Sequence, residues 1–271
     1  MKIFKDKLNL QNELIKNKYV SFIPTMGGLH KGHISLIKKS QKFKLKTLVS
    51  IYVNPKQFNN KTDYNTYPRN TKRDFKILKN LKVDYIYKPP FRDIYGFRPK
   101  HKVFLDKLSK QLCGKFRKGH FEGVLNVVNR LLEIIKPKYI FMGKKDYQQI
   151  YLIKKHIYKR NIKSKIIECD TIREKNGIAC SSRNLKLSIK EKKIASKIYL
   201  LIKKIKKKGG IKFNSLTKKN LKKEIINLGA NKIDYVECYD VKKFKKKNLI
   251  STNSNLFIAY YINNIRLIDN I

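Results

Sequence analysis

The chain has 271 residues, of which 41% are hydrophobic, so it is long enough to bury one large core or two modest ones. No apolar run is long enough to span a bilayer, and the N-terminus has no signal-peptide core, which argues against a membrane partner or a secretory leader. Lys and Arg number 65 against 19 Asp and Glu, which gives a formal net charge of +46.

The positive charge has two interpretations. One is binding to nucleic acid or to an anionic membrane. The other is drift in base composition, because the abundant Lys, Asn, Ile, Tyr and Phe have AT-rich codons. We favour the second, since the lysines lie along the whole chain, and we expect no specific nucleic-acid partner. The four cysteines are scattered without a CxxC pair, which indicates reduced thiols and a cytoplasmic location.

Short apolar runs alternate with longer segments of helical periodicity in the N-terminal part of the chain. The expected strands are Tyr19–Ile23, Thr47–Val53, Asp84–Tyr87, Tyr139–Met142 and Lys165–Cys169. The expected helices are Ile34–Lys42, Thr71–Asn80, Gly123–Ile135 and Gln148–Tyr158. This alternation predicts an α/β fold with a Rossmann-like, doubly wound parallel sheet.

The pattern changes after Asn184, which predicts a second domain. Ser188 and Glu191 form a capping-box pattern for a helix that runs to about Lys207, and a second helix is expected over Leu216–Leu228. The strands expected after these helices are Asp234–Tyr239, Leu256–Ile262 and Ile265–Ile268. The sequence therefore predicts a Rossmann-like domain over residues 1–184 and a small α+β domain over residues 185–271.

The segment Phe22–His33 is the most informative stretch of the chain. An apolar strand leads into a Pro-Thr-Met-Gly-Gly turn, followed by His30 and His33 at the start of a helical pattern. This layout is typical of a phosphate site, in which the N–H groups of a turn and of a helix N-terminus face the anion. Two imidazoles beside it can stabilise the charge that develops on phosphoryl oxygens.

Four further segments combine polar groups with glycine or a turn signal. Asn54 and Gln57 follow an expected strand, at the sheet edge where open α/β folds bind ligands. Arg117–Val124 precedes a helix, and its Arg117 and His120 could meet an anion. The other two segments are Gly143–Gln149, in which Asp146 can cap the next helix, and Ala179–Asn184, which offers hydroxyls and a guanidinium to a phosphate.

These five ordered segments resemble the pantothenate synthetases, a family of ligases that join pantoate to β-alanine. The resemblance covers nearly the whole chain, including Tyr67-Pro-Arg69 and Arg266–Asn270. His30-Lys-Gly-His33 also matches the His-x-Gly-His signature of the wider nucleotidyltransferase class. The resemblance implies that pantoate attacks the α-phosphate of ATP, with Mg²⁺ present, to give pantoyl adenylate and pyrophosphate. The amine of β-alanine then displaces AMP, and the family is usually homodimeric.

The resemblance also implies roles for individual residues. His33, His30 and Lys145 would act in catalysis. Gln57 and Gln149 would bind pantoate, with Asn54 supporting the pocket. The ATP site would comprise Met26, Gly27, Gly28, Leu29, His30, Lys31, Gly32, His33, Gly143, Lys144, Lys145, Asp146, Ile172, Cys180, Ser181, Ser182 and Arg183. The residues that hold Mg²⁺ are not assigned.

Some positions depart from the family pattern, and two other functions stay open. Lys31, Lys144 and Cys113 stand where acidic residues are usual, and Cys180 replaces the usual Leu; we expect these changes to alter affinity more than mechanism. One alternative function is that of another His-x-Gly-His nucleotidyltransferase or a tRNA synthetase-like fragment. The other is a non-catalytic nucleic-acid-binding protein, whose binding would weaken steeply with salt.

Overall fold

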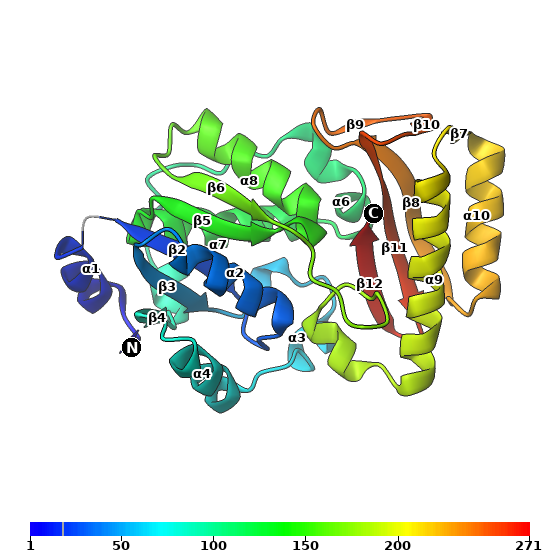
Figure 1. The fold of residues 1–271 in the computed structure, drawn as a ribbon. Helices are drawn as coiled ribbons and strands as arrows, with labels where there is room; N and C mark the ends of the chain where they lie inside the picture. The colour runs from blue at the N-terminus through cyan, green and yellow to red at the C-terminus, as the bar shows by residue number, and fades with distance from the viewer. Residues whose placement is uncertain (18) are drawn as a thin grey trace. The chain divides into compact units, whose positions relative to one another are not determined.

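The computed structural model describes residues 1–17 and 19–271, and it divides into two compact units, Met1–Asp170 and Thr171–Ile271 (Figure 1). The elements of the first unit are β1 (Lys2–Phe4), α1 (Lys7–Ile15), β2 (Val20–Thr25), α2 (Lys31–Gln41), β3 (Lys46–Ile51), η1 (Pro55–Gln57), α3 (Lys61–Asn65), α4 (Thr71–Asn80), β4 (Tyr85–Tyr87), α5 (Phe91–Tyr95), η2 (Lys107–Lys110), α6 (Cys113–Phe116), α7 (His120–Ile135), β5 (Tyr139–Gly143), η3 (Lys144–Asp146), α8 (Tyr147–Lys159) and β6 (Lys165–Cys169).

The first unit is built on a six-stranded sheet in the order β1-β4-β3-β2-β5-β6, and all of its strand pairs are parallel. The predicted doubly wound parallel sheet is therefore confirmed. The chain moves from β2 to β3 on one side and later returns to β5 on the other. The strand order thus reverses at β2, and such a switch point is where open α/β sheets bind ligands.

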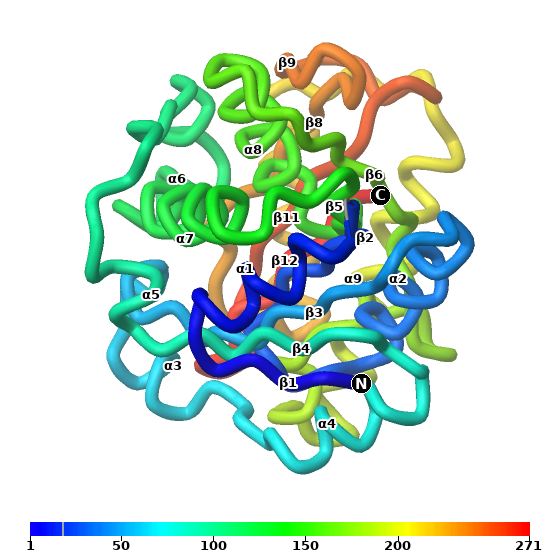
Figure 2. The backbone as a smooth tube through the Cα atoms, turned by 90° about the vertical axis from the view of Figure 1, so that its left-hand side faces the viewer, coloured from blue at the N-terminus to red at the C-terminus, as the bar shows by residue number. Residues whose placement is uncertain are grey.

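Helices cover both faces of this sheet because its strands are apolar on both sides. On one face, Ile23, Val49 and Phe141 pack with Ile37 of α2 and Leu78 of α4. Side chains alternate along a strand, so the neighbouring residues face the opposite side, where α7 lies. Figure 2 shows α2 and α4 on one side of the strands and α7 on the other.

The second unit packs two helices on an antiparallel sheet. Its elements are η4 (Ser182–Lys186), α9 (Ile189–Lys208), β7 (Ile211–Lys212), α10 (Ser215–Asn227), β8 (Lys232–Asp240), β9 (Lys245–Lys246), β10 (Leu249–Ile250), β11 (Ser254–Ile262) and β12 (Ile265–Asn270). The four-stranded sheet has the order β12-β11-β8-β9, and β7 pairs with β10. Buried residues such as Ile202, Ile225 and Val236 join the helices to the sheet. The expected Ser188–Glu191 capping box is present.

The units divide at Asp170, whereas the sequence analysis placed the domain boundary at residue 184. The segment between these positions bonds within the second unit. Arg173 pairs with Ala179 in an antiparallel bridge, and its guanidinium donates to both carboxylate oxygens of Asp269 at 2.6 and 3.0 Å. This hairpin is held by Asp269, which lies 96 residues after Arg173. Its own sequence therefore gives no signal that the domain boundary precedes it.

Two N-terminal elements, β1 and α1, had no counterpart among the expected elements. β1 has only three residues, and it exists because Ile3 pairs with Ile86 of β4. Asp6 then caps α1 by accepting the N–H of Asn9 at 2.8 Å. In residues 1–17 and 19–271, no helix combines the length and the apolarity needed to cross a membrane.

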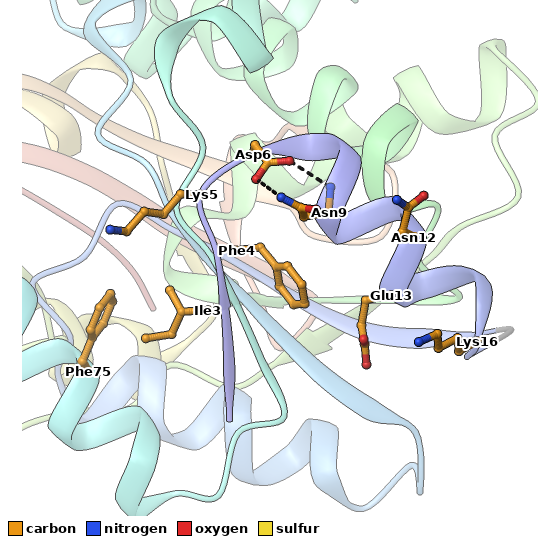
Figure 3. Close-up of a pocket in the computed structure, with 9 residues that line it drawn as sticks. All are labelled: Ile3, Phe4, Lys5, Asp6, Asn9, Asn12, Glu13, Lys16 and Phe75. Atoms are coloured by element: carbon orange, nitrogen blue, oxygen red, sulfur yellow. Dashed lines mark hydrogen bonds between the residues drawn. The ribbon is translucent and has the colours of Figure 1, made fainter.

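A pocket of about 720 Å³ lies at this N-terminal end of the first unit (Figure 3). Ile3, Asp6, Glu13 and Phe75 are among its lining residues, and none of the residues assigned to a site from the sequence lines it. Its two carboxylates are already engaged, because Asp6 caps α1 and Glu13 binds Lys2 at 2.9 Å. This pocket is therefore separate from the candidate site.

Candidate active site

Three loops leave the parallel sheet at the same edge, at the carboxyl ends of β2, β3 and β5. Thr25, the last residue of β2, pairs with Ile51, the last residue of β3. β5 runs alongside β2 in parallel, with Phe22 opposite Ile140, and ends at Gly143. The sheet therefore brings the Met26–His33, Asn54–Gln57 and Gly143–Gln149 segments to one edge, as the sequence predicts.

His30 and His33 form the N-terminal cap of α2. The helix starts at Lys31, three residues before the predicted start, so His30 is the capping residue and His33 lies in the first turn. Nδ1 of His30 accepts the N–H of Gly32 at 3.1 Å, and Nδ1 of His33 accepts the N–H of His30 at 3.3 Å. The two ring centroids are 4.0 Å apart.

The capping bonds fix the tautomer of both histidines. Because each Nδ1 accepts a hydrogen bond, each neutral ring carries its proton on Nε2. Both residues are of intermediate exposure, between buried and fully exposed, and neither capping bond uses Nε2–H. The backbone N–H groups of the cap thus leave the two histidines as a pair of neutral N–H donors. They lie at a helix N-terminus, where an anion is stabilised.

Burial keeps the two imidazoles neutral. Burial, with the charge of Lys145, lowers the pKa of His30 from 6.5 to about 4. Burial, the neighbouring His30 and Lys145 together lower the pKa of His33 well below 6.5. The charge of Lys145 acts on both rings, and Lys145 follows β5 at the same edge of the sheet as the histidine turn. At neutral pH the two histidines are therefore uncharged and supply N–H donors.

Lys145 and its neighbours occupy η3, directly after β5. Nζ of Lys145 lies 3.6 Å from Oδ2 of Asp146. Asp146 precedes α8, but its side chain makes no capping bond, so the predicted cap is wrong; the carboxylate faces Lys145 instead. Lys144 forms a 2.7 Å ion pair with the exposed Asp170. This pairing directs the ammonium of Lys144 toward the end of β6.

The backbone of the glycine turn does not face outward as expected. The N–H groups of Gly28 and Leu29 each donate to a carboxylate oxygen of Asp74 at 2.9 Å, and the N–H of Gly27 donates to Oγ1 of Thr25 at 3.2 Å. These three N–H groups are satisfied within the protein. The expectation that these N–H groups face outward is therefore wrong, and the part that Met26–His33 plays in nucleotide binding stays a prediction.

Asn54 and Gln57 form a polar cluster after β3. Asn54 is fully buried and donates to the carbonyl of Gly123 at 3.0 Å, while its Oδ1 accepts the hydroxyl of Tyr95 at 2.8 Å. Nε2 of Gln57 lies 2.8 Å from the sulfur of Met26 and joins the β3 loop to the histidine turn. Asn54 thus supports this loop, and the partly exposed Gln57 can face a ligand.

The main chain of Gln57 is held from α7. Nδ1–H of the buried His120 donates to the carbonyl of Gln57 at 2.7 Å, and Nε2 of His120 accepts from Arg117 at 3.0 Å. We expected Arg117 and His120 to meet an anion, but in the structure they hold Gln57. Gly123 permits the close approach, since a Cβ there would lie 2.3 Å from the carbonyl oxygen of Lys56.

The adjacent glutamines at the start of α8 differ sharply. Gln148 is buried, donates to the carbonyls of Leu108 and Gln111, and accepts the N–H of Cys113 at 3.1 Å. Gln149 is partly exposed. Gln148 therefore anchors the loop before α6. Gln149 is exposed enough to meet a ligand, and its predicted binding of pantoate stays a prediction. Cys113, one of the departures from the family pattern, is buried in this anchor.

The remaining predicted residues, Ile172 and Cys180–Arg183, lie in the second unit. The N–H of Cys180 donates to the carbonyl of Ile172 at 2.9 Å, which joins these residues in a single hairpin. Ser181 caps η4 by accepting the N–H of Arg183 at 3.2 Å. The structure brings these residues together with each other, and their part in nucleotide binding stays a prediction.

Sequence reasoning missed Asp74 and Thr25, which shape the histidine turn from inside. Asp74 lies on α4, and the apolar periodicity that predicts this helix says nothing about where its one buried carboxylate points. In the sequence, Thr25 is one residue of a Pro-Thr-Met-Gly-Gly turn. Its capping of Gly27 is an ST-type turn, and this is the one local signal that could have been used.

Comparisons with known proteins agree over the whole chain. The family model described as pantoate-beta-alanine ligase matches residues 2–271. The pantothenate synthetase of Francisella tularensis subsp. novicida (strain U112) is 40% identical over 266 residues, which cover 97% of this chain and 92% of that protein.

Two solved structures share this architecture. The pantoate-beta-alanine ligase from Francisella tularensis, complexed with beta-gamma ATP and beta-alanine, is 38% identical with a TM-score of 0.85, covering 100% of this chain and 97% of that one. A pantothenate synthetase from Thermus thermophilus is 27% identical with a TM-score of 0.90, covering 100% of this chain and 99% of that one.

Proposed function

The chain belongs to the pantoate-β-alanine ligase family, and we propose from this membership and from the site that it is a ligase that condenses pantoate with β-alanine at the expense of ATP. The products are pantothenate, AMP and pyrophosphate. The observation that carries the proposal is the paired Nε2–H donors of His30 and His33 beside Lys145, at the switch point of the sheet.

The reaction begins when a carboxylate oxygen of pantoate attacks the α-phosphate of ATP and pyrophosphate leaves. Negative charge shifts onto the phosphate oxygens during this step, and His30, His33 and Lys145 offer donors for it. Such preorganised donors are worth about 10²–10³ in rate each. The neutral state of both histidines fits this role, because Nδ1 of each ring can then accept its capping N–H while Nε2–H remains a donor for phosphate.

The second step needs pantoate held while the amine of β-alanine attacks its activated carbonyl carbon. AMP then leaves with one oxygen of the original carboxylate. Gln57 and Gln149 have amides that can donate to and accept from the hydroxyls of pantoate. The backbone of Gln57 is fixed by His120 and Asn54 packs beneath it, which supports a preformed pocket on this side.

Magnesium enters this proposal as part of the ATP substrate. Over residues 1–17 and 19–271, the structure has no group of three or more His, Cys, Asp or Glu side chains that could hold a metal ion. Mg²⁺ commonly keeps several waters and binds through substrate phosphates together with one or two carboxylates. A partly exposed carboxylate, Asp146, lies beside Lys145 and is the residue we assign to face either that ion or the ribose.

We further propose that the protein acts in the cytoplasm as a homodimer and that Ile172 and Cys180–Arg183 contribute to ATP binding. The family resemblance supports each of these points. Light scattering on the purified protein tests the dimer, and a mass equal to one chain would contradict it.

Incubation with ATP, Mg²⁺, pantoate and β-alanine tests the activity, with product identification by mass spectrometry. Pantothenate and AMP should appear in equal amounts, and omission of either pantoate or β-alanine should abolish pantothenate. Replacing pantoate with a hydroxyl-lacking carboxylic acid serves as the specificity control. ADP in place of AMP, or turnover without pantoate, would overturn the proposed function.

A further inference from the structure

A buried carboxylate holds the histidine turn from behind. Asp74 is 2% exposed, and its two oxygens accept different N–H groups, Oδ2 that of Gly28 and Oδ1 that of Leu29, each at 2.9 Å. The two partners precede it by 46 and 45 residues, so the turn is held by a tertiary contact with α4. A carboxylate on two N–H groups is a charge-assisted pair and is stronger than neutral hydrogen bonds.

The shape of the turn depends on this contact. Gly27 and Gly28 have φ of +77° and +61°, a left-handed conformation that side chains rarely adopt. A Cβ at Gly27 would lie 2.9 Å from Oδ2 of Asp74, so the carboxylate packs directly against the turn. With Thr25 holding Gly27, three consecutive N–H groups point into the protein. The next residue is His30, whose position therefore follows from the turn.

We propose that Asp74 is a positioning residue for the ATP step: its carboxylate occupies the N–H groups of Gly28 and Leu29 and thereby sets the place of His30 and His33. This inference rests on the proposed function. Asp74 does not touch the phosphates in this account; it takes the place that an anion takes in other glycine turns. Phosphate binding is thereby left to the imidazoles and Lys145.

An opposing account makes a different prediction from the same contact. If the turn's N–H groups were the true phosphate donors, Asp74 would be a competitor of ATP, and removing it would tighten ATP. If Asp74 positions the turn, removing it would weaken ATP and slow the reaction. Asp74→Ala separates these accounts, because it frees both N–H groups. Asp74→Asn offers one acceptor and places an NH₂ group against the second N–H.

The first experiment measures steady-state kinetics for Asp74→Ala and Asp74→Asn. We expect kcat/KM for ATP to fall on the order of 10- to 100-fold in both, while the KM for pantoate stays within about twofold of the wild type. Asp93→Asn is the matched control: Asp93 is also buried, accepts the Tyr87 hydroxyl at 3.0 Å and lies outside the site. A tighter ATP complex in Asp74→Ala, or wild-type ATP kinetics in both variants, would overturn the inference.

A second measurement uses the wild-type protein, so it stands even if the variants fail to fold. The amides of Gly28 and Leu29 should be protected from hydrogen exchange in the free protein and stay protected when a non-hydrolysable ATP analogue binds. Loss of that protection, or a large analogue-induced shift of these two amide resonances, would contradict the assignment. The readout needs no turnover, so an inactive wild-type enzyme would refute the proposed function while leaving this test intact.

Discussion

The backbone N–H of His30 donates to Nδ1 of His33 at 3.3 Å, so the first histidine of the motif orients the second. Nδ1 of His30 is itself taken by the N–H of Gly32. Each ring therefore has one nitrogen committed to the helix cap and one, Nε2–H, directed away from it. The spacing of three residues is what allows the first residue to cap the helix while the second occupies its third position.

This division of the two ring nitrogens gives a matched pair of variants at His33. His33→Asn keeps an acceptor near the place of Nδ1 and loses the Nε2–H donor, whereas His33→Gln keeps a donor near Nε2 and loses the cap. We expect His33→Asn to retain its thermal stability and to lose about 10²–10³ in kcat. His33→Gln should retain more activity and lose about 0.5–2 kcal/mol of stability. Kinetics with thermal unfolding checks both, and equal activity in the two variants would contradict the assigned roles.

Lys145 lowers the pKa of His30, which gives a spectroscopic test of their proximity. In Lys145→Met the pKa of His30 should rise above its value of about 4, yet stay below 6.5, because burial, the larger cause, remains. Lys144→Met is the control, since Lys144 pairs with Asp170 and is not among the causes of the His30 shift. NMR titration of the His30 ring measures this, and an unchanged pKa in Lys145→Met would place the ammonium elsewhere. The same variant should lose about 10²–10³ in kcat.

The buried histidines also predict how stability depends on pH. His30 and His156 have folded pKa values of about 4, against 6.5 ordinarily, and the pKa of His33 is lowered too. Between these values the unfolded chain binds more protons, so the free energy of unfolding falls as pH drops from about 6.5 toward 4. Carboxylates with ordinary pKa values near 4 contribute to the slope mainly below about pH 5.

Urea unfolding at about pH 7 and about pH 5.5 measures this loss, in a window where histidines dominate the titration. His156→Asn is the informative variant, because His156 accepts the Phe104 N–H at 3.1 Å and lies outside the site. It should lower the stability at neutral pH and flatten the dependence on pH. Equal stability of the wild type at the two pH values would show that the histidines are not held neutral.

Gln148 and Gln149 provide a prediction from neighbouring residues of the same type. Gln149→Ala should raise the KM for pantoate with little change in melting temperature. Gln148→Ala should destabilise the protein by about 1–3 kcal/mol, because it leaves buried partners in the Leu108–Cys113 segment without their hydrogen bonds. Thermal unfolding and pantoate titration measure the two effects, and a reversal of the pattern would exchange the roles assigned to the two glutamines.

The sequence was sufficient to predict the parallel sheet and three of the loops at its carboxyl edge, because strands buried on both faces are apolar and a glycine or an Asn-Pro turn follows each of the three. The exposed strand β1 could not be predicted from the sequence, because Lys2–Phe4 has no apolar periodicity and forms a strand only by pairing with β4. The capping box at Ser188 was predictable because both partners lie within four residues.

Contacts between distant residues account for what the sequence did not reveal in the site. The sequence of Met26–His33 is typical of a phosphate-binding turn, but in the structure the carboxylate of Asp74, from another helix, accepts two of its N–H groups. The sequence suggests that Arg117 and His120 bind an anion, but in the structure His120 donates to the carbonyl of Gln57, 63 residues earlier. In both cases the local pattern identified polar groups of the right kind, and only tertiary packing decided what they bind.

Oxygen transfer from pantoate tests the central claim most directly. With both carboxylate oxygens of pantoate labelled as ¹⁸O, attack on the α-phosphate followed by displacement by β-alanine should leave one labelled oxygen in AMP and one in pantothenate. Mass spectrometry of the isolated AMP measures this. Unlabelled AMP, or label found in inorganic phosphate, would contradict an acyl-adenylate mechanism at the His30–His33 site.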